Sequence, residues 1–341
     1  MRTILVGDNM SEVEAQFYEK RENNRVKCFL CPHHCSLQEG QEGLCRVRVN
    51  RGGSLYSLNY GDIAAVALDP IEKKPLFHFY PGKLILSIGT YGCNLACSFC
   101  QNFSLAHEKP DISNLDIKSL LEIAWRVKSK GSIGVAFTYN EPSIWYEFIR
   151  ETAPMLKEQG QKIVLVSNGY IESQPLRELL PWVDAMNIDV KAFSDDFYRH
   201  HCRGRLKAVL KTVEMAAAVT HVEVTNLIIP EENDNIKEIK KLVSWLAAID
   251  PGLPLHFSRY YPAYNFNKAA TPAYSLKLAQ ELAKEYLNFV YLGNIPGEEC
   301  NTCCLECGEV MVKRNTYDVK VVGLKDGRCQ HCGSKVDYIL T

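Results

Sequence analysis

The stretch LILSIGTYGCNLACSFC, residues 84–100, joins an apolar run to three closely spaced cysteines. Residues 84–88 have the composition of a strand buried on both faces, which is typical of a parallel sheet. Cys93, Cys97 and Cys100 follow with C-x3-C-x2-C spacing. In an α/β barrel these cysteines would lie just past the C-terminal end of a strand, where such barrels carry their chemistry.

Three thiolates on one short loop can hold three corners of a cubic [4Fe–4S] cluster and leave the fourth iron without a protein ligand. An iron with an open position can bind a small molecule and pass an electron to it. A zinc knuckle lacking a fourth ligand and three structural thiols are the alternatives. The spacing of Cys93, Cys97 and Cys100 resembles the signature of the radical SAM superfamily, which implies a [4Fe–4S] cluster and S-adenosylmethionine as cofactors.

Strand-like and helix-like runs alternate between residues 84 and 295. This alternation indicates an α/β fold whose parallel sheet has right-handed crossovers. Six or seven such units fit a partial (β/α)6 TIM-like barrel, which the resemblance favours, or a doubly wound open sheet. The expected strands are 84–88, 133–138, 162–167, 185–190, 221–228, 255–258 and 289–292. The expected helices are 117–130, 142–158, 206–219, 235–248 and 272–286.

Polar side chains lie at or near the ends of several expected strands. If the cluster binds S-adenosylmethionine, the expected pocket residues are Phe99, Asn140, Glu141, Ser167, Asn168, Asp189, Lys191, Thr225 and His256. Catalytic residues beyond the cluster and this pocket are not predicted. Glu141 matches in position the Gly-Gly-Glu-Pro element of the superfamily, although this chain has Tyr139 and Asn140 in place of the glycines.

Each of these residues also has a plainer explanation. Glu141 precedes an expected helix and suits the positive end of its dipole. Asp189 and Lys191 lie on one side of a strand and could form a structural ion pair. A single histidine such as His256 is more often a core residue with satisfied hydrogen bonds than a ligand contact.

Two further cysteine groups flank the expected barrel and predict three regions: residues 1–82, 83–297 and 298–341. The C-terminal group has two C-x2-C pairs, a strong signal for a zinc-ribbon or rubredoxin-like site that holds zinc or iron on Cys304, Cys307, Cys329 and Cys332. The N-terminal group predicts a zinc site or a second iron–sulfur cluster on Cys28, Cys31, Cys35 and Cys45. Cys202 is expected to be an inert buried thiol.

The bulk composition is that of an ordinary globular protein. The 341 residues are 46% hydrophobic with a net charge of −1, so no basic excess indicates a nucleic-acid partner. No run of about 18 apolar residues predicts a membrane span, and the opening apolar run is too short for a signal peptide. Fourteen cysteines, mostly in short clusters, suit metal sites in a reducing compartment, so the cytoplasm is expected.

From about residue 25 onward the chain resembles the AmmeMemoRadiSam system radical SAM enzymes, which are related to pyruvate formate-lyase activating enzymes. The resemblance rests on residues 28–35, 69–75, 87–90, 100–102, 139–142, 187–191 and 293–297, together with the C-terminal cysteine pairs. It implies reductive cleavage of S-adenosylmethionine and hydrogen abstraction from a substrate. The implied partners are a one-electron donor such as flavodoxin or ferredoxin and possibly a protein substrate.

The resemblance leaves the substrate open. A protein from which hydrogen is abstracted, as by glycyl-radical activating enzymes, is one hypothesis. Radical modification of a small molecule or of a protein side chain is the second. A non-catalytic iron–sulfur electron carrier or sensor is the third, and the open-iron triad argues against it because a carrier needs four protein ligands.

Overall fold

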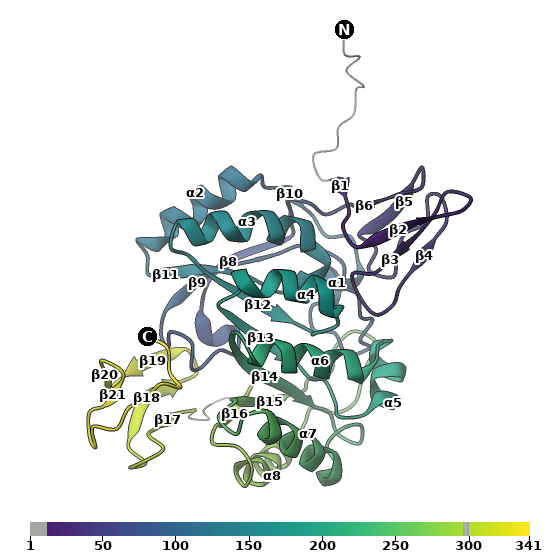
Figure 1. Cartoon of the computed structure of the whole chain (residues 1–341). Helices are drawn as coiled ribbons and strands as arrows, with labels where there is room; N and C mark the ends of the chain where they lie inside the picture. The colour runs from purple at the N-terminus through teal and green to yellow at the C-terminus, as the bar shows by residue number, and fades with distance from the viewer. Residues whose placement is uncertain (1–11, 296, 298–299) are drawn as a thin grey trace.

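The structure of the chain, a computed structural model, describes residues 12–295, 297 and 300–341. Parts of the expected terminal regions, residues 1–11 and 298–299, and Pro296 of the last expected barrel loop lie outside the described residues. The central element is one eight-stranded sheet in the order β16-β15-β14-β13-β12-β11-β9-β8. Figure 1 shows this sheet between an N-terminal group of strands and a C-terminal group that lie on opposite sides of it.

Seven strands of this sheet are parallel, which confirms the expected α/β fold. Their apolar, β-branched composition suits burial on both faces. They are β9 (Leu84–Gly89), β11 (Ser132–Phe137), β12 (Lys162–Ser167), β13 (Ala185–Asp189), β14 (His221–Ile228), β15 (Leu255–Arg259) and β16 (Val290–Gly293). Strand β8 (Ala65–Pro70) adds an antiparallel edge beside β9. The expected boundary at residue 82 therefore falls between β8 and β9, which pair with each other in the same sheet, so β8 belongs to the central sheet and not to the N-terminal region. Within the described residues, the edge strands β8 and β16 do not pair, so the sheet is open.

Helices cover one face of this sheet in the order of the strands (Figure 1). They are α2 (Ile117–Lys128), α3 (Tyr146–Glu158), α4 (Ser173–Leu179), α6 (Leu206–Ala217), α7 (Ile236–Ile249) and α8 (Ala273–Lys284). Each buries an apolar stripe, such as Leu242 and Leu246 of α7. The side chain of Asp116 caps α2 by accepting a hydrogen bond from the backbone N–H of Ser119. Short helices α1 (Phe103–His107) and α5 (Asp195–Phe197), with a π-helical turn at Tyr198–Cys202, complete the loops.

The other face of the sheet is filled near its N-terminal end by the segment that joins β8 to β9. Ile71, Leu76 and Phe79 of this segment are buried against Ala136 and Val164 of the sheet. The short 3-10 helix at Ile71–Lys73 opens the segment. We call this segment, residues 71–83, the plug. It covers the inner face of the sheet near the N-terminal ends of the strands and leaves the C-terminal ends of the strands uncovered.

Both terminal regions are built from short strands. The N-terminal strands are β1 (Val13–Glu14), β2 (Tyr18–Arg21), β3 (Arg25–Cys28), β4 (Ser36–Leu37), β5 (Arg48–Arg51) and β6 (Ser54–Ser57). The C-terminal strands are β17 (Thr302–Cys303), β18 (Val310–Asn315), β19 (Asp318–Val321), β20 (Leu324–Lys325) and β21 (Arg328–Cys329). A small pair of β7 (Asp62–Ile63) and β10 (Ser113–Asn114) lies beside the main sheet.

Buried polar contacts join the C-terminal strands to the plug segment. The buried guanidinium of Arg314 donates to the backbone oxygen of Phe77 at 2.5 Å and stacks over the Phe77 ring. His78 bonds the Tyr338 backbone oxygen at 2.9 Å and the Tyr291 hydroxyl at 2.7 Å. Burial lowers the pKa of His78 to about 3, so the ring is neutral at neutral pH. Within the described residues, no helix has the length and apolarity to cross a membrane.

Candidate functional site

The three central cysteines lie on the loop that follows β9, at the C-terminal end of that strand. Backbone hydrogen bonds fix this loop, since Ala96 N–H donates to the oxygen of Cys202 and Ser98 N–H donates to the oxygen of His201, both at 2.9 Å. The side-chain amide of Asn94 donates to the oxygen of Tyr170 at 2.6 Å. The loop is therefore held in place by elements that follow β12 and β13.

Gly92 is the residue that lets this loop pass close to the N-terminal strands. Its φ is +84°, and a Cβ atom there would lie 2.6 Å from the backbone oxygen of Cys45. A side chain at position 92 would therefore be strained and would also clash. The absence of a side chain at Gly92 lets the backbone just before Cys93 pack directly against the backbone of Cys45.

A cavity of about 770 Å³ lies above the plug, at the C-terminal ends of the parallel strands. The thiol-bearing residues Cys93, Cys97 and Cys100 line it. Eight of the nine predicted pocket residues line the same cavity: Phe99, Asn140, Glu141, Ser167, Asn168, Asp189, Lys191 and Thr225. The structure thus brings together residues from four separate strand ends and the cysteine loop.

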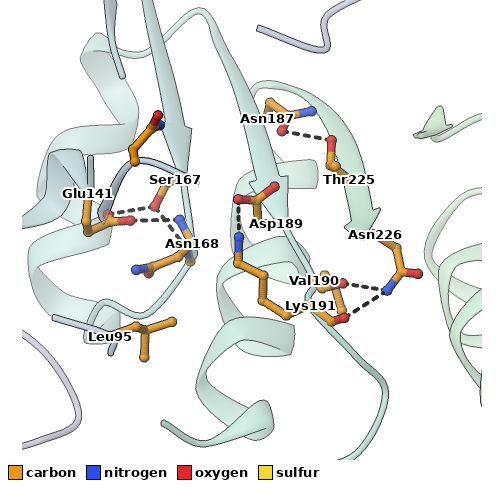
Figure 2. Close-up of polar contacts among 12 residues, drawn as sticks. Leu95, Glu141, Ser167, Asn168, Asn187, Asp189, Val190, Lys191, Thr225 and Asn226 are labelled. Atoms are coloured by element: carbon orange, nitrogen blue, oxygen red, sulfur yellow. Dashed lines mark hydrogen bonds and ion pairs between the residues drawn. The ribbon is translucent and has the colours of Figure 1, made fainter. Parts of the chain in front are cut away.

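Glu141 links the ends of β11 and β12 beside the cysteine loop, as Figure 2 shows. One carboxylate oxygen accepts from the Ser167 hydroxyl at 2.8 Å and from the Ser143 N–H at 2.9 Å. The other accepts from the Asn168 N–H at 2.7 Å. Burial raises the pKa of Glu141 above its usual value, although these donors favour the charged form. Glu141 is therefore a positioning residue that shapes the cavity wall.

Asn168 connects this network to the cysteines. Its side-chain amide donates to the Asn94 side-chain oxygen at 3.0 Å and approaches the sulfur of Cys93 at 3.6 Å. Its own side-chain oxygen accepts from the Tyr170 N–H at 2.8 Å. The amide is thus locked in one orientation, with a donor beside a sulfur that faces the cavity.

Asp189 and Lys191 form an ion pair on the cavity wall, with the lysine Nζ 2.5 Å from the carboxylate (Figure 2). Burial works against the charged form of Lys191, but attraction to Asp189 and to the Cys97 thiol raises its pKa above the usual value. The loop after β13 is fixed by Asn226, whose amide donates to the oxygen of Val190 at 2.8 Å. The pair presents one negative and one positive group to a ligand.

The thiols of the triad have raised pKa values, so they are protonated at neutral pH while no metal is bound. A hydrogen bond with the Cys202 thiol, followed by burial, raises the pKa of Cys97 well above its usual value. Burial raises the pKa of Cys100 to about 11 and that of Cys93 well above its usual value. Such thiols lose their protons when they bind iron. The donor set therefore fits a [4Fe–4S] cluster with one open iron.

Tyr139 keeps a glycine-like backbone conformation without being glycine. Its φ is +73°, in the left-handed region. A bulky side chain that adopts this conformation costs roughly 1–2 kcal/mol. Its hydroxyl donates to the carboxylate of Asp69 at 2.7 Å, and the ammonium of Lys74 lies 4.7 Å from its ring. These contacts offset the strain, so Tyr139 holds a backbone conformation that favours glycine.

His256 is the predicted pocket residue that the structure does not bring to the cavity. It is 3% exposed and lies deeper in the sheet, where its Nε2 bonds the carboxylate of Glu223 at 2.6 Å. Glu223 also accepts from the backbone N–H groups of Phe77 and His78 in the plug. The plainer explanation of His256 as a core histidine with satisfied hydrogen bonds is the one its position supports.

Sequence reasoning assigned no role to several residues that line the remaining wall. Asp69 of the edge strand β8 binds Lys74 at 2.9 Å and Lys73 at 3.1 Å. Arg259 lies near the opposite edge and donates to the Tyr261 hydroxyl at 3.1 Å. The wall is completed by Gln101, Asn102, Asn294 and, from the C-terminal strands, Tyr317. The charged stretch at residues 69–74, between two apolar strands, is the signal that could have revealed this part.

The two flanking cysteine groups differ in their spacing. Among the described residues, Cys304, Cys307, Cys329 and Cys332 are the only group of three or more candidate ligands whose donor atoms all lie within 4.8 Å of one another. The sulfurs of Cys304 and Cys332, and those of Cys307 and Cys329, are 3.7 Å apart. This group could hold a metal ion. The N-terminal cysteines Cys28, Cys31, Cys35 and Cys45 line one small cavity instead. Within the described residues, no three of their sulfurs all lie within 4.8 Å of one another.

Comparison with known proteins agrees with this geometry. A model of the radical SAM superfamily matches residues 87–246. An uncharacterized protein of Methanocaldococcus jannaschii is 41% identical over 96% of this chain and 99% of its own length. A putative glycyl-radical enzyme activating enzyme of the same organism is 26% identical over 60% of this chain and 79% of its own length.

Among solved structures, SuiB of Streptococcus suis bound to S-adenosylmethionine has a TM-score of 0.50 and is 15% identical to this chain. The match covers 61% of this chain and 51% of that one. At this level of identity the likeness concerns the fold alone. The two chains therefore share a similar fold over the matched part.

Proposed function

The chain belongs to the radical SAM superfamily, and from this premise we propose that it cleaves S-adenosylmethionine reductively to start a radical reaction. Cys93, Cys97 and Cys100 would hold a [4Fe–4S] cluster. When bound, the cluster and S-adenosylmethionine supply an electron and a 5′-deoxyadenosyl radical that abstracts hydrogen from a substrate. The observation that carries the proposal is the convergence of the three cysteines and eight polar or aromatic residues on one cavity.

The side chains of the cavity have distinct parts in this proposal. The Asp189–Lys191 pair offers an acceptor and donors to the charged amino-acid end of the ligand, while Asn168 keeps its amide beside the sulfur of Cys93. Glu141, itself part of the cavity wall, keeps Ser167 and Asn168 in position. Thr225 donates to the Asn187 side-chain oxygen at 3.1 Å and contributes a polar edge on the next strand. All of these groups are positioned on strand ends before a ligand arrives, which lowers the entropic cost of binding it.

A protein substrate is the first candidate for hydrogen abstraction. Two relatives in Methanocaldococcus jannaschii are named putative glycyl-radical enzyme activating enzymes. The cavity extends from the edge strand β8 to the loops after β15 and β16. A cavity that spans the whole sheet in this way is long enough to hold a peptide segment.

A small molecule that carries an anionic group is the second candidate. Asp69 balances only one of its two lysine neighbours, Lys73 and Lys74. Arg259, on the opposite side of the cavity, contacts neutral groups: the backbone oxygen of Thr271 and the ring and hydroxyl of Tyr261. The part of the cavity away from the cysteines therefore carries an excess of positive charge.

The remaining components follow from the chemistry of the sites. We propose zinc for Cys304, Cys307, Cys329 and Cys332, because sulfurs 3.7 Å apart suit four ligands on one tetrahedral ion. A flavodoxin or ferredoxin would supply single electrons. The free thiols of the chain suit the cytoplasm, where a reducing environment keeps cysteines available to metals.

Electron paramagnetic resonance of the anaerobically reduced protein tests the proposal. Addition of S-adenosylmethionine should change the cluster spectrum, because the ligand would occupy the open iron. An unchanged spectrum would support a non-catalytic electron carrier instead. Deuterium transfer from labelled candidate substrates into 5′-deoxyadenosine would then separate the protein substrate from the small molecule.

A further inference from the structure

We propose that Cys28, Cys31, Cys35 and Cys45 hold a second [4Fe–4S] cluster, which relays electrons to the central one. The ligands of this second cluster all lie in the N-terminal region. Its relay role rests on the proposed function, because that function supplies the electron acceptor. The two parts of the proposal have separate tests.

The four cysteines come together on one enclosed site although they are spread over 18 residues of sequence. Cys28 ends β3, and its N–H donates to the oxygen of Cys35 at 3.0 Å, which folds the intervening turn back on itself. Cys45 enters from the loop before β5. All four side chains line one small cavity, whose other walls are largely apolar, as with Leu30, Leu37 and Ile144. Such a closed, dry site suits a cluster that exchanges electrons and binds no substrate.

The sulfur spacing favours a cluster over a zinc ion. In a tetrahedral zinc site with Zn–S bonds of about 2.3 Å, the sulfurs lie roughly 3.8 Å apart. The C-terminal cysteines match this spacing. Within the described residues, no three N-terminal cysteines have sulfurs that are all within 4.8 Å of one another. Thiolates on four different irons of a cubane lie farther apart than thiolates on one ion, so an N-terminal site without three sulfurs inside 4.8 Å fits the cluster.

A buried arginine, already ion-paired with Glu147 through one guanidinium nitrogen, turns a second nitrogen toward the cysteines. Arg48 is 1% exposed, lines the same cavity and has a guanidinium nitrogen 4.0 Å from the sulfur of Cys28. Its Nε–H has no hydrogen-bond partner in the described structure. A cluster with four thiolate ligands is anionic and has sulfur acceptors, so it can satisfy a buried donor that is otherwise costly to leave unpaired.

The N-terminal site adjoins the central cysteine loop. His33 lines the N-terminal cavity, and its Nε2 hydrogen-bonds to the backbone oxygen of Asn94 at 2.6 Å. On the other side, the backbone oxygen of Cys45 packs against Gly92. Asn94 and Gly92 are the two neighbours of Cys93 in the sequence. The two sets of ligands are therefore connected by one hydrogen bond and by direct backbone contact.

The relay requires only electron transfer. A one-electron carrier of the flavodoxin or ferredoxin class reduces the N-terminal cluster from the 2+ to the 1+ state. The cluster then returns to 2+ as the central cluster accepts that electron, and no bond forms or breaks at the N-terminal site. Four cysteine ligands leave no open iron there, which suits a carrier of electrons.

The presence of the second cluster is tested in a variant whose N-terminal region is intact. Cys93→Ala, Cys97→Ala and Cys100→Ala together remove the central ligands. After anaerobic reconstitution this triple variant should retain about four irons per chain, with a reduced-cluster spectrum that S-adenosylmethionine does not change. Less than one iron per chain, with or without zinc in its place, would overturn the assignment. This result does not depend on any cleavage of S-adenosylmethionine.

The relay is tested with the double variant Cys31→Ser and Cys35→Ser. Its rate of 5′-deoxyadenosine formation is measured with reduced flavodoxin and, separately, with dithionite. The ratio of the flavodoxin rate to the dithionite rate should fall at least tenfold relative to the unmodified protein. Cys303→Ser, at an exposed cysteine outside both sites, should keep the original ratio. An unchanged ratio in the double variant would overturn the relay role.

Discussion

The carboxylate of Glu141 accepts a hydrogen bond from the backbone N–H of Asn168 at 2.7 Å, which ties the end of β11 to the end of β12. The side chain of Asn168 in turn approaches the sulfur of Cys93. Glu141, which follows β11, thereby fixes the position of Asn168, and Asn168 forms the part of the cavity wall beside Cys93. The cavity is shaped by buried polar groups that satisfy one another before any ligand binds.

Glu141→Gln tests this arrangement. The amide of glutamine would place a donor against the N–H of Ser143, the hydroxyl of Ser167 or the N–H of Asn168, so one buried donor would lose its acceptor. We expect the free energy of unfolding to fall by about 1–3 kcal/mol, with weaker binding of S-adenosylmethionine. Denaturant titration and calorimetry measure the two effects. Glu158→Gln, at an exposed position of the same chain, should change neither. Equal behaviour of the two variants would contradict the positioning role.

Tyr139 provides a test of backbone strain. With φ at +73°, an alanine at this position keeps the strain and loses the contacts with Asp69 and Lys74. A glycine loses the same contacts and relieves the strain. Tyr139→Gly should therefore be more stable than Tyr139→Ala by about 1–2 kcal/mol. Thermal or denaturant unfolding of the pair measures the difference, and equal stability would mean that the left-handed conformation is not retained.

Stability should fall in mild acid because of His78. Burial lowers the pKa of this ring to about 3, whereas in the unfolded chain its pKa is near 6.5. Between these values the unfolded state binds a proton that the folded state does not. The contribution of His78 is therefore complete above about pH 6.5 and is lost as the pH falls toward 3, by up to about 1.4 kcal/mol per pH unit.

Unfolding by denaturant from pH 7 to pH 4.5 measures this dependence. His78→Gln cannot take up a proton, so its unfolding free energy should fall less steeply over the same range. Parallel curves for the two proteins would show that the ring is not held neutral between Tyr291 and Tyr338.

The C-terminal cysteine group should act as a structural metal site. Removal of its metal by a chelator should unfold residues 300–341, because their buried apolar cluster is small and includes Cys304 and Cys329 themselves. Hydrogen exchange should become fast there while the β12 and β13 amides stay protected. Cys307→Ser should lose the same metal equivalent and keep the central iron. Loss of central iron with this variant would contradict a separate structural site.

The parallel sheet could be predicted closely from the sequence, because its strands are continuous apolar runs separated by helical periodicity. Strands 162–167 and 221–228 begin and end where expected. The alignment of polar residues at strand ends also predicted most of the cavity wall, since parallel strands end at the same edge.

Other features depend on contacts distant in sequence. The depth of His256 is set by its bond to Glu223 and by the plug segment, neither of which strand periodicity reveals. Strand β8 is antiparallel and precedes the alternating β and α elements, so nothing in that alternation indicated that Asp69 would reach the cavity. The left-handed turn at Tyr139 is stabilised by that same Asp69 and could not be predicted from a tyrosine.

The central claim concerns Cys93, Cys97 and Cys100, and its most direct measurement is the formation of 5′-deoxyadenosine. The reconstituted protein, reduced with dithionite under anaerobic conditions, is incubated with S-adenosylmethionine and the product is quantified by chromatography. The unmodified protein should form 5′-deoxyadenosine and methionine, and Cys97→Ala should form neither while its circular dichroism stays native. Product formation by Cys97→Ala at the unmodified rate, or none by the unmodified protein with its cluster intact, would contradict the account.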